Sequence, residues 1–163
     1  MHPAQLPIDE LLADCETRRG RRSGPGGQHR NKVETAVTLT HTVTGIQGDA
    51  SERRSQAENR KVAIFRLRVN LALEHRAEAV PLSELWASRT KNGKLTVSRS
   101  HDDFPALLAE ALDRLAVASW DDSEAAKSLG ISRSQLLRFL KVEPRALRQL
   151  NDSRAEQGKK PLR

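Results

Sequence analysis

The sequence has few cysteines, no histidines at the spacing of metal ligands and no long apolar runs. Each of these absences excludes a class of protein. Cys15 is the only cysteine, so the chain can form neither an internal disulfide nor a cysteine-based zinc site. The five histidines lack the His-x-x-x-His spacing of metal ligands, so we expect no metal and no cofactor. No apolar stretch approaches the ~20 residues that a membrane span needs, so we expect no membrane contact.

The N-terminal residues also lack the apolar run of a signal peptide and the arginines of a transit peptide, which favours a cytoplasmic location. Aromatic residues make up only 3% of the 163 residues, but 37% are hydrophobic, which suffices for the core of one domain with an appendage. The net charge of +7 and a pI near 10.2 favour a polyanionic partner, most often a nucleic acid.

The first half of the chain predicts a small α+β unit. Asp9 and Glu10 favour a turn or two of helix within residues 1–17, and residues 18–32, which hold six basic and no acidic residues, predict an exposed loop. The period-two stretch "TAVTLTHTVTG" predicts a strand, and "IQGDA" after Gly45 predicts a second strand that returns antiparallel.

A long helix is predicted to follow this hairpin, from a cap at Ser51 to about Ala79, before Pro81. Its core-facing stripe consists of Val62, Phe65, Val69, Ala72 and Leu73. A hairpin packed on one long helix predicts an α+β domain over residues 1–80.

The rest of the chain predicts a linker over residues 81–102, with Asn92-Gly93 as a turn, and a helical region with a basic tail over residues 103–163. Asp102 or Asp103 caps its first helix, in which Pro105 takes an early position, and Pro144 opens the last. Between them, "DSEAAKSLGISRSQLLRFLK" is typical of a helix-turn-helix with caps at Ser123 and Ser132 and a turn at Gly130. Its predicted core is Ala126, Leu129, Ile131, Leu136 and Leu140.

Two polar motifs flank the predicted hairpin. "SGPGGQHRNK", residues 23–32, precedes it, and "ERRSQAENRK", residues 52–61, opens the helix that follows. A bare Gly-Gly-Gln is weak evidence because glycine is common. Two motifs at a fixed separation, joined by a hairpin, are much more specific.

At these residues the chain resembles the catalytic domain of class I peptide chain release factors and of the related codon-independent ribosome rescue hydrolases. The resemblance covers about residues 15–78, and Pro25 and Lys32 are closer to the rescue branch. The hairpin residues 40–46, "THTVTGI", also fit the family pattern. The matching residues are Ser23, Gly24, Gly26, Gly27, Gln28, His29, Asn31, Arg54, Ser55, Gln56 and Asn59.

The resemblance implies hydrolysis of the peptidyl-tRNA ester by water in the peptidyl-transferase centre of the ribosome. Gly26 and Gly27 would permit an unusual backbone turn, and the amide of Gln28 would stabilise the transition state while its side chain admits water. His29 as a general base is a weaker alternative. The implied RNA-binding residues are Arg21, Arg22, Arg30, Lys32, Arg54, Gln56, Lys159 and Lys160.

The implied partners are the rRNA of the large subunit and the P-site peptidyl-tRNA, and a glutamine methyltransferase acting on Gln28 is a further candidate. Arg54, Gln56 and Asn59 are expected to orient the catalytic loop or contact RNA, with a solvated helix face as the alternative. The target could be a stalled 70S ribosome, a split large subunit or a terminating ribosome.

The sequence departs from a standard release factor in several places. About twenty residues precede the first motif, which predicts that the stop-codon-reading domain is absent and favours codon-independent rescue. Arg30 replaces the usual valine, and Gly20 stands where a strand-forming residue is expected. The alternative function is a non-catalytic RNA- or DNA-binding protein that uses the helix-turn-helix, with Arg133, Ser134 and Arg138 on its second helix.

Overall fold

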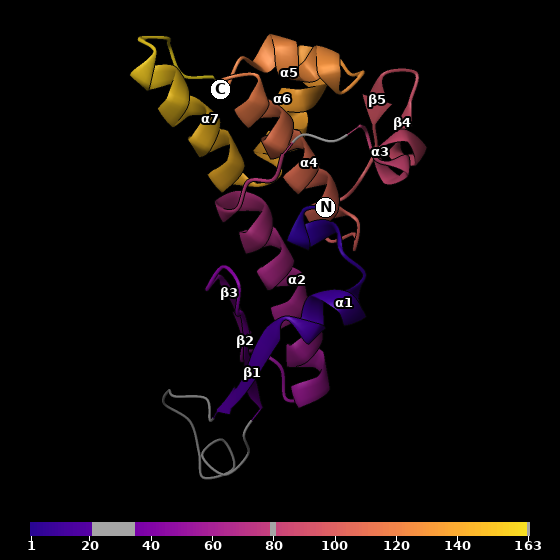
Figure 1. The fold of residues 1–163 in the computed structure, drawn as a ribbon, viewed down its shortest axis with the longest axis vertical. Helices are drawn as coiled ribbons and strands as arrows, with labels where there is room; N and C mark the ends of the chain where they lie inside the picture. The colour runs from indigo at the N-terminus through magenta and orange to yellow at the C-terminus, as the bar shows by residue number, and fades with distance from the viewer. Residues whose placement is uncertain (21–34, 79–80, 163) are drawn as a thin grey trace.

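A three-stranded antiparallel sheet packed on a long helix, with a helical half beyond it, forms the architecture of the chain (Figure 1). The computed structural model describes residues 1–20, 35–78 and 81–162. This arrangement confirms the predicted α+β fold class. A 3-10 helix, Pro3–Gln5, and the short helix α1, Ile8–Ala13, precede the sheet, and Asp9 and Glu10 lie in the first turn of α1 as predicted.

The sheet consists of β1 (Cys15–Gly20), β2 (Ala36–His41) and β3 (Gln47–Ala50), in that order across the sheet. The predicted hairpin is confirmed, because β2 and β3 pair antiparallel with Val37 opposite Ala50. The prediction of a loop from residue 18 is wrong at its start, since residues 18–20 belong to β1. The sequence of β1, "CETRRG", is polar and mostly exposed, and it lacks the alternation of apolar and polar residues that predicts a strand. The strand therefore depends on its pairing with β2.

The long helix α2 spans Gln56–Glu74 and is shorter at both ends than predicted. Its N-cap is Ser55, whose hydroxyl accepts a hydrogen bond from the Glu58 amide, and the predicted cap at Ser51 is wrong. The backbone of Arg53 is instead held by the Asn59 side chain, which keeps the residues before Ser55 out of the helix.

Helix α2 lies between β2 and β3 on one side and α4 on the other. Ala63, Leu67 and Leu71 are fully buried, and of the predicted stripe, Val69, Ala72 and Leu73 are buried as well. Val62 and Phe65 are only partly buried, but both pack against the core, as predicted. A helix with packing partners on two sides buries more than one stripe, which a single-face pattern does not reveal.

Residues 81–102, predicted as a linker, contain helix α3 (Glu84–Arg89) and the two-residue strands β4 (Thr90–Lys91) and β5 (Lys94–Leu95). The turn at Asn92-Gly93 is confirmed, with φ angles of 49° and 70°. Trp86 is buried, and its indole N–H donates to the Leu129 carbonyl at 2.9 Å. This tryptophan fixes the segment to the helices that follow it.

Four helices complete the chain: α4 (Phe104–Val117), α5 (Asp122–Ser128), α6 (Arg133–Lys141) and α7 (Pro144–Glu156). The predicted helix-turn-helix corresponds to α5 and α6, with Gly130 at φ 66° between them and Ser132 as the N-cap of α6. Asp121 caps α5 in place of the predicted Ser123, because its carboxylate accepts from the Ser123 and Glu124 amides. All five predicted core residues of this motif are buried.

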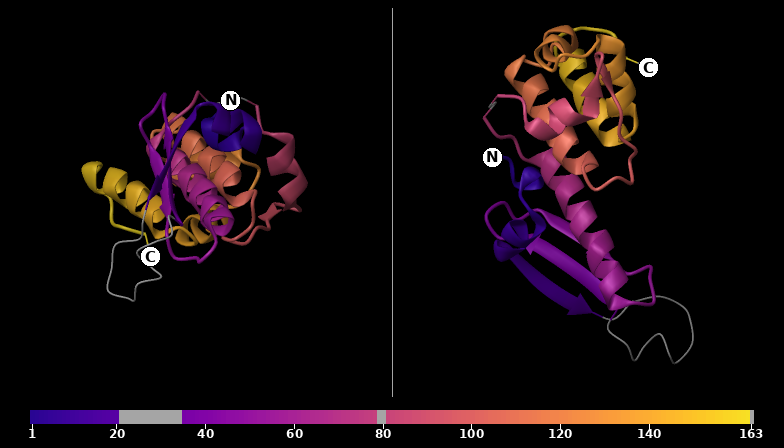
Figure 2. Two further views of the ribbon diagram at one scale, coloured as in Figure 1. Left: turned by 90° about the horizontal axis from the view of Figure 1, so that it is seen from below. Right: turned by 90° about the vertical axis from the view of Figure 1, so that its right-hand side faces the viewer.

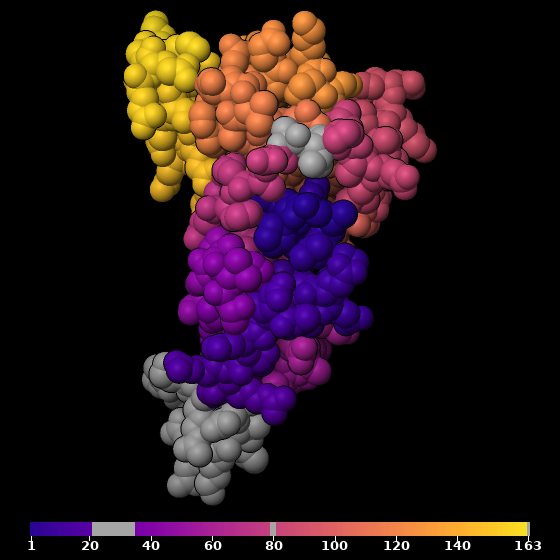
Figure 3. Space-filling view, viewed as in Figure 1, coloured from indigo at the N-terminus to yellow at the C-terminus, as the bar shows by residue number. Residues whose placement is uncertain are grey.

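The sheet half and the helical half share one core, which runs without interruption from Ala4 to Leu150. The N-terminal segment lies over their junction, as the indigo residues in Figure 3 and the two views in Figure 2 show. Arg68 of α2 is buried there and donates to the carbonyls of Ala4 and Asp102 at 2.8–3.1 Å. Within the described ranges, no helix has the length and apolar character needed to cross a bilayer.

Candidate functional site

The residues predicted to carry the chemistry lie in the segment between β1 and β2, outside the described residues. The structure describes the strands on either side of this segment and the helix start that the second motif supplies. The predicted residues outside the described ranges are Gly26, Gly27, Gln28, Arg21, Arg22, Arg30 and Lys32.

The two strands bring the ends of this segment to one place. Gly20, the last residue of β1, pairs with Ala36, the first residue of β2. Both lie at the end of the sheet that is farthest from helices α5–α7 (Figure 1). A Cβ atom added at Gly20 would meet nothing within 4 Å, so the departure from the family pattern at this position needs no special backbone.

Asn59 fastens the C-terminal end of the segment to the start of α2. Its side chain is completely buried, and its amide nitrogen donates to the Thr35 carbonyl at 2.7 Å and to the Arg53 carbonyl at 3.0 Å. Its amide oxygen accepts from the Arg53 N–H at 2.9 Å. One side chain therefore satisfies three backbone groups and fixes Thr35, the residue directly before β2.

The remaining members of the second motif form the start of the helix. Ser55 is the N-cap, and Gln56 is the first helical residue and is half-buried. Arg54 is exposed directly before the cap. Of the motif residues, Asn59 is the one whose side chain contacts the backbone directly before β2, and its polar character alone does not distinguish a buried anchor from a solvated residue.

Lys159 and Lys160, predicted as RNA-binding residues of a basic tail, follow α7, which lies in the half of the molecule opposite β1 and β2 (Figure 1). Both are exposed, but the chain around them folds back onto α7. The Asn151 side chain exchanges two hydrogen bonds with the Leu162 backbone, and the Arg154 guanidinium donates to the Lys160 carbonyl. The tail is thus part of the helical half, and Gly158 at φ 68° allows the turn.

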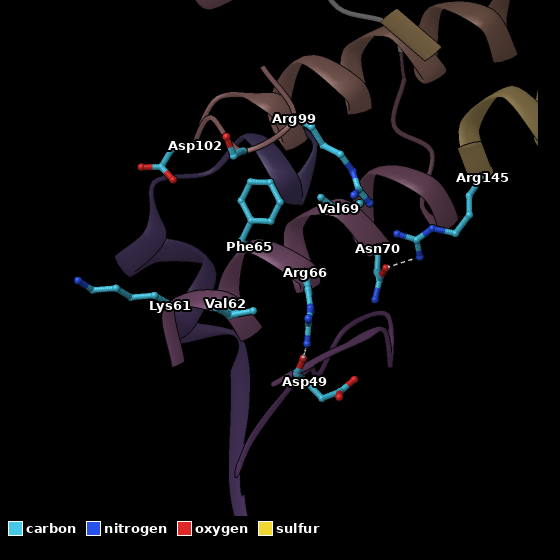
Figure 4. Close-up of a pocket in the computed structure, with 11 residues that line it drawn as sticks. Asp49, Lys61, Val62, Phe65, Arg66, Val69, Asn70, Arg99, Asp102 and Arg145 are labelled. Carbon is cyan, nitrogen blue, oxygen red and sulfur yellow. Dashed lines mark hydrogen bonds between the residues drawn. The ribbon is translucent and has the colours of Figure 1, made fainter. Parts of the chain in front are cut away.

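A groove of about 780 Å³ lies beside α2, bordered by β3, the segment before α4 and the start of α7 (Figure 4). Its apolar floor contains Val62, Phe65 and Val69. The arginines at its rim are engaged in ion pairs: Arg66 with Glu52 at 2.7 Å, and Arg99 and Arg145 with the buried Glu143 at 3.0 and 2.8 Å.

Three residues of the second helix of the helix-turn-helix were predicted to contact nucleic acid. Two of them, Ser134 and Arg138, are exposed, and Arg138 forms no ion pair with a described residue. Arg133 instead pairs with the buried Asp122 at 2.7 Å and ties α6 to α5. Among the residues that the structure describes, no group of three or more His, Cys, Asp or Glu side chains could hold a metal ion.

A family model matches the part of the chain that contains the sheet and α2, and proteins with a known name are similar to part of the chain. A family model described as "RF-1 domain" matches residues 6–102. Peptide chain release factor 2 of Variovorax paradoxus is 52% identical over 66 residues, which are 40% of this chain and 18% of that protein. Peptide chain release factor 1 of Ureaplasma parvum is 42% identical over 71 residues, which are 42% of this chain and 20% of the relative.

Peptide chain release factor 1 of Xylella fastidiosa is 38% identical over 78 residues, which are 48% of this chain and 19% of that protein. The chain thus matches about a fifth of the length of these curated relatives. The RF-1 domain match includes the first motif, the three strands, α2 and α3, and it ends before α4 begins at Phe104.

Proposed function

The chain belongs to the RF-1 domain family, whose model matches residues 6–102, and from this membership we propose that it hydrolyses the ester bond of peptidyl-tRNA on the ribosome. The observation that carries the proposal is the string from Ser23 to Lys32 with Gly26, Gly27 and Gln28 at its centre. It lies between β1 and β2, within the residues 6–102 that the RF-1 domain model matches.

The chemistry proposed for this string needs no side-chain nucleophile. Gly26 and Gly27 allow a backbone turn that residues with a Cβ rarely adopt, and they let the chain approach RNA closely. The amide N–H of Gln28 then donates to the oxygen on which negative charge develops as water attacks the ester. A single donor of this kind contributes about 10²–10³ in rate. The Gln28 side chain admits water and excludes larger nucleophiles.

The scaffold supports this mechanism by holding the base of the segment. Gly20 and Ala36 are paired across β1 and β2, and Asn59 holds Thr35 through its buried amide. Fixing both ends restricts the conformations open to the residues between them. Orientation of this kind is a large part of catalysis that works by positioning.

RNA contacts accompany the chemistry in the proposal. Arg21, Arg22, Arg30 and Lys32 flank the Gly-Gly-Gln string and would bind phosphates of large-subunit rRNA and P-site tRNA. Arg54 and Gln56 at the start of α2 would extend this contact. Modification of Gln28 by a glutamine methyltransferase belongs to the same proposal.

Rescue of stalled ribosomes without codon reading is the form of the activity that we favour. Pro25 and Lys32 resemble the rescue branch of the family more closely than the codon-reading branch. A release reaction that depends on the string alone would require no stop codon in the A site.

Peptide release from purified ribosomes with peptidyl-tRNA in the P site tests the proposal. We expect release when the A site is empty, and we expect Gly27→Ala to slow it about 10²–10³-fold because the new methyl group displaces the Gln28 amide. Gln28→Ala keeps the backbone amide but removes the side chain that admits water, so it should slow release and relax the exclusion of larger nucleophiles. Gln47→Ala, which truncates an exposed glutamine on β3, is the matched control and should release peptide at the parental rate.

The same assay separates the parts of the proposal. Release that requires a stop codon in the A site would overturn the rescue assignment and leave ester hydrolysis standing. Absence of release from every complex, with the protein shown to be bound to the ribosome, would overturn the hydrolase itself.

A further inference from the structure

Two stretches of the C-terminal half contain no acidic residue. Residues 85–101 and residues 125–142 lie between acidic residues of the sequence and include none themselves. The first stretch carries Arg89, Lys91, Lys94 and Arg99, and the second carries Lys127, Arg133, Arg138 and Lys141. They are separated in the chain by the whole of α4.

The fold brings these two stretches together. The Trp86 indole N–H donates to the Leu129 carbonyl at 2.9 Å, and its ring meets Phe139 of α6 edge-on, with centroids 6.3 Å apart. β5 packs on α6, and a Cβ at Gly93 would lie 3.9 Å from the Gly130 carbonyl oxygen. The tip of the β4–β5 hairpin therefore lies beside the turn that joins α5 to α6.

Acidic partners neutralise three of the eight cations. Arg89 pairs with Asp103, Arg99 with Glu143 and Arg133 with Asp122. The other five are exposed and form no ion pair with any described residue. These five, called the basic cluster below, are Lys91, Lys94, Lys127, Arg138 and Lys141.

The exposed side of α6 has the composition of a surface that binds phosphate. Ser134, Arg138 and Lys141 are exposed at spacings of four and three residues, which places them on one side of the helix. Buried Leu136, Phe139 and Leu140 occupy the other side. The second helix of a helix-turn-helix commonly makes the nucleic-acid contact, and unpaired cations on neighbouring elements attract a polyanion without reading its sequence.

We propose that the basic cluster binds the phosphate backbone of folded RNA and forms a second RNA contact, separate from the segment between β1 and β2. The cluster lies in the half of the molecule that is remote from Gly20 and Ala36 (Figure 1). The protein would therefore hold RNA at both ends of its long axis. The choice of RNA over DNA rests on the proposed ribosomal function. The proposal that the cluster binds a phosphate backbone does not depend on that function.

The groove beside α2 is a weaker candidate for this contact. Three of the four cations that line it, Arg66, Arg99 and Arg145, are paired with Glu52 or Glu143, and only Lys61 has no ion pair with a described residue, so binding a phosphate there would require breaking ion pairs (Figure 4). Phosphate binding at the basic cluster would break no ion pair with a described residue.

Titration of a labelled RNA hairpin of about 16 base pairs, and of a DNA duplex of the same sequence, tests the proposal over a range of salt concentrations. Two double variants remove charge from the cluster: Lys91→Gln with Lys94→Gln, and Arg138→Gln with Lys141→Gln. We expect each to weaken RNA binding about tenfold in 0.1 M salt and to reduce the salt slope by about 1–2, as expected for the loss of one or two phosphate contacts.

The matched control removes two exposed cations elsewhere that form no ion pair with a described residue, by Arg18→Gln with Arg148→Gln, and should leave the affinity within about twofold. If the control weakens RNA binding equally, the loss of net charge alone explains the effect, and the proposal that the basic cluster binds RNA is overturned. Binding of the DNA duplex as tightly as the RNA would overturn the RNA assignment in favour of a DNA-binding face. Unchanged affinity in both cluster variants would overturn the proposal as well.

Gln28→Ala distinguishes this proposal from the hydrolase. It should bind the RNA hairpin as the parent does, because the cluster is remote from the segment that contains Gln28. If no variant of the chain hydrolyses peptidyl-tRNA, the binding result still stands. Thermal unfolding of each double variant should match the parent, since all four substituted side chains are exposed.

Discussion

Asn59 is the side chain that holds the backbone at Thr35, where the proposed catalytic segment joins β2. This side chain is fully buried and satisfies the Thr35 carbonyl and both backbone groups of Arg53. Asn59→Ala would leave all three groups without partners, and we expect the free energy of unfolding to fall by about 2–4 kcal/mol. Urea denaturation measures this loss.

The same substitution should slow peptide release by more than the unfolded fraction accounts for, because Thr35 is no longer held. Asn70→Ala is the matched control on the same helix: its amide donates to the Gln47 carbonyl at an exposed site, so it should cost less and leave release unchanged. Equal effects of the two substitutions on release would contradict a positioning role for Asn59.

His2 makes the stability depend on pH. Burial lowers the pKa of His2 from 6.5 to about 4, and the neutral ring accepts from the Ala4 amide through Nδ1 and can donate to the His75 carbonyl through Nε2. Between pH 4 and 6.5 the unfolded chain therefore binds more protons at this residue than the folded chain. The stabilisation is fully present above pH 6.5 and is lost as the pH falls to about 4.

His2→Gln removes this titration. We expect the stability difference between parent and variant to shrink by up to about 3 kcal/mol as the pH falls from 6.5 to 4. Burial raises the pKa of Asp113 to about 6, which acts in the opposite sense, but Asp113 titrates in both proteins and so cancels in the difference. Urea denaturation at each pH gives the two curves, and parallel curves would refute the assignment to His2.

At the scale of elements, the contact of β3 with α2 requires a glycine. A Cβ at Gly48 would lie 2.3 Å from the Leu67 nitrogen and 2.4 Å from the Ala63 carbonyl oxygen, and both are backbone atoms that cannot rotate away. Gly48→Ala must therefore push the strand off the helix. We expect a loss of at least about 3 kcal/mol, measured by thermal or urea unfolding.

Gly20→Ala is the control for this contact, because it adds the same methyl group to the same sheet where nothing lies within 4 Å. It should be neutral or slightly stabilising, since alanine loses less backbone freedom than glycine on folding. A Gly48→Ala protein as stable as Gly20→Ala would show that β3 and α2 do not meet this closely.

The elements also show which local signals were sufficient. Alternating Val37 and Leu39 predicted β2, and Ser132, Gly130 and Pro144 predicted the boundaries of the last helices, because caps and turns are encoded within a few residues. In the segment 81–102 only the Asn92-Gly93 turn was predicted, although Ser83 caps α3. Its helix is short, and its anchor Trp86 is a single side chain that contacts residues more than forty positions away.

For the whole molecule, the question is whether the two halves unfold together. Residues 1–80 and 103–163 were predicted as separate domains, and that division stays a prediction. The shared core and the bridging Arg68 favour one cooperative unit. Trp86 and Trp120, the only tryptophans, both lie in the helical half, so their fluorescence reports on that half alone.

Leu39→Ala tests this coupling from the sheet half. Leu39 is completely buried in β2, and its truncation should destabilise the sheet by about 2–5 kcal/mol. If the halves unfold as one unit, tryptophan fluorescence will record the full loss. An unshifted fluorescence transition, beside a shifted circular dichroism transition, would establish two independent units. Val43→Ala, at a side chain that is 77% exposed, should shift neither signal.

The sequence by itself determined the two polar motifs, the hairpin between them, the long helix and the helix-turn-helix, because charge, period, caps and turn residues act over short distances along the chain. The tertiary structure alone decided that polar β1 joins the sheet, that Asn59 is a buried anchor, that the tail folds back on α7 and that two acid-free stretches meet at the basic cluster. Each of these depends on partners distant in sequence, so no local pattern of residues could reveal them.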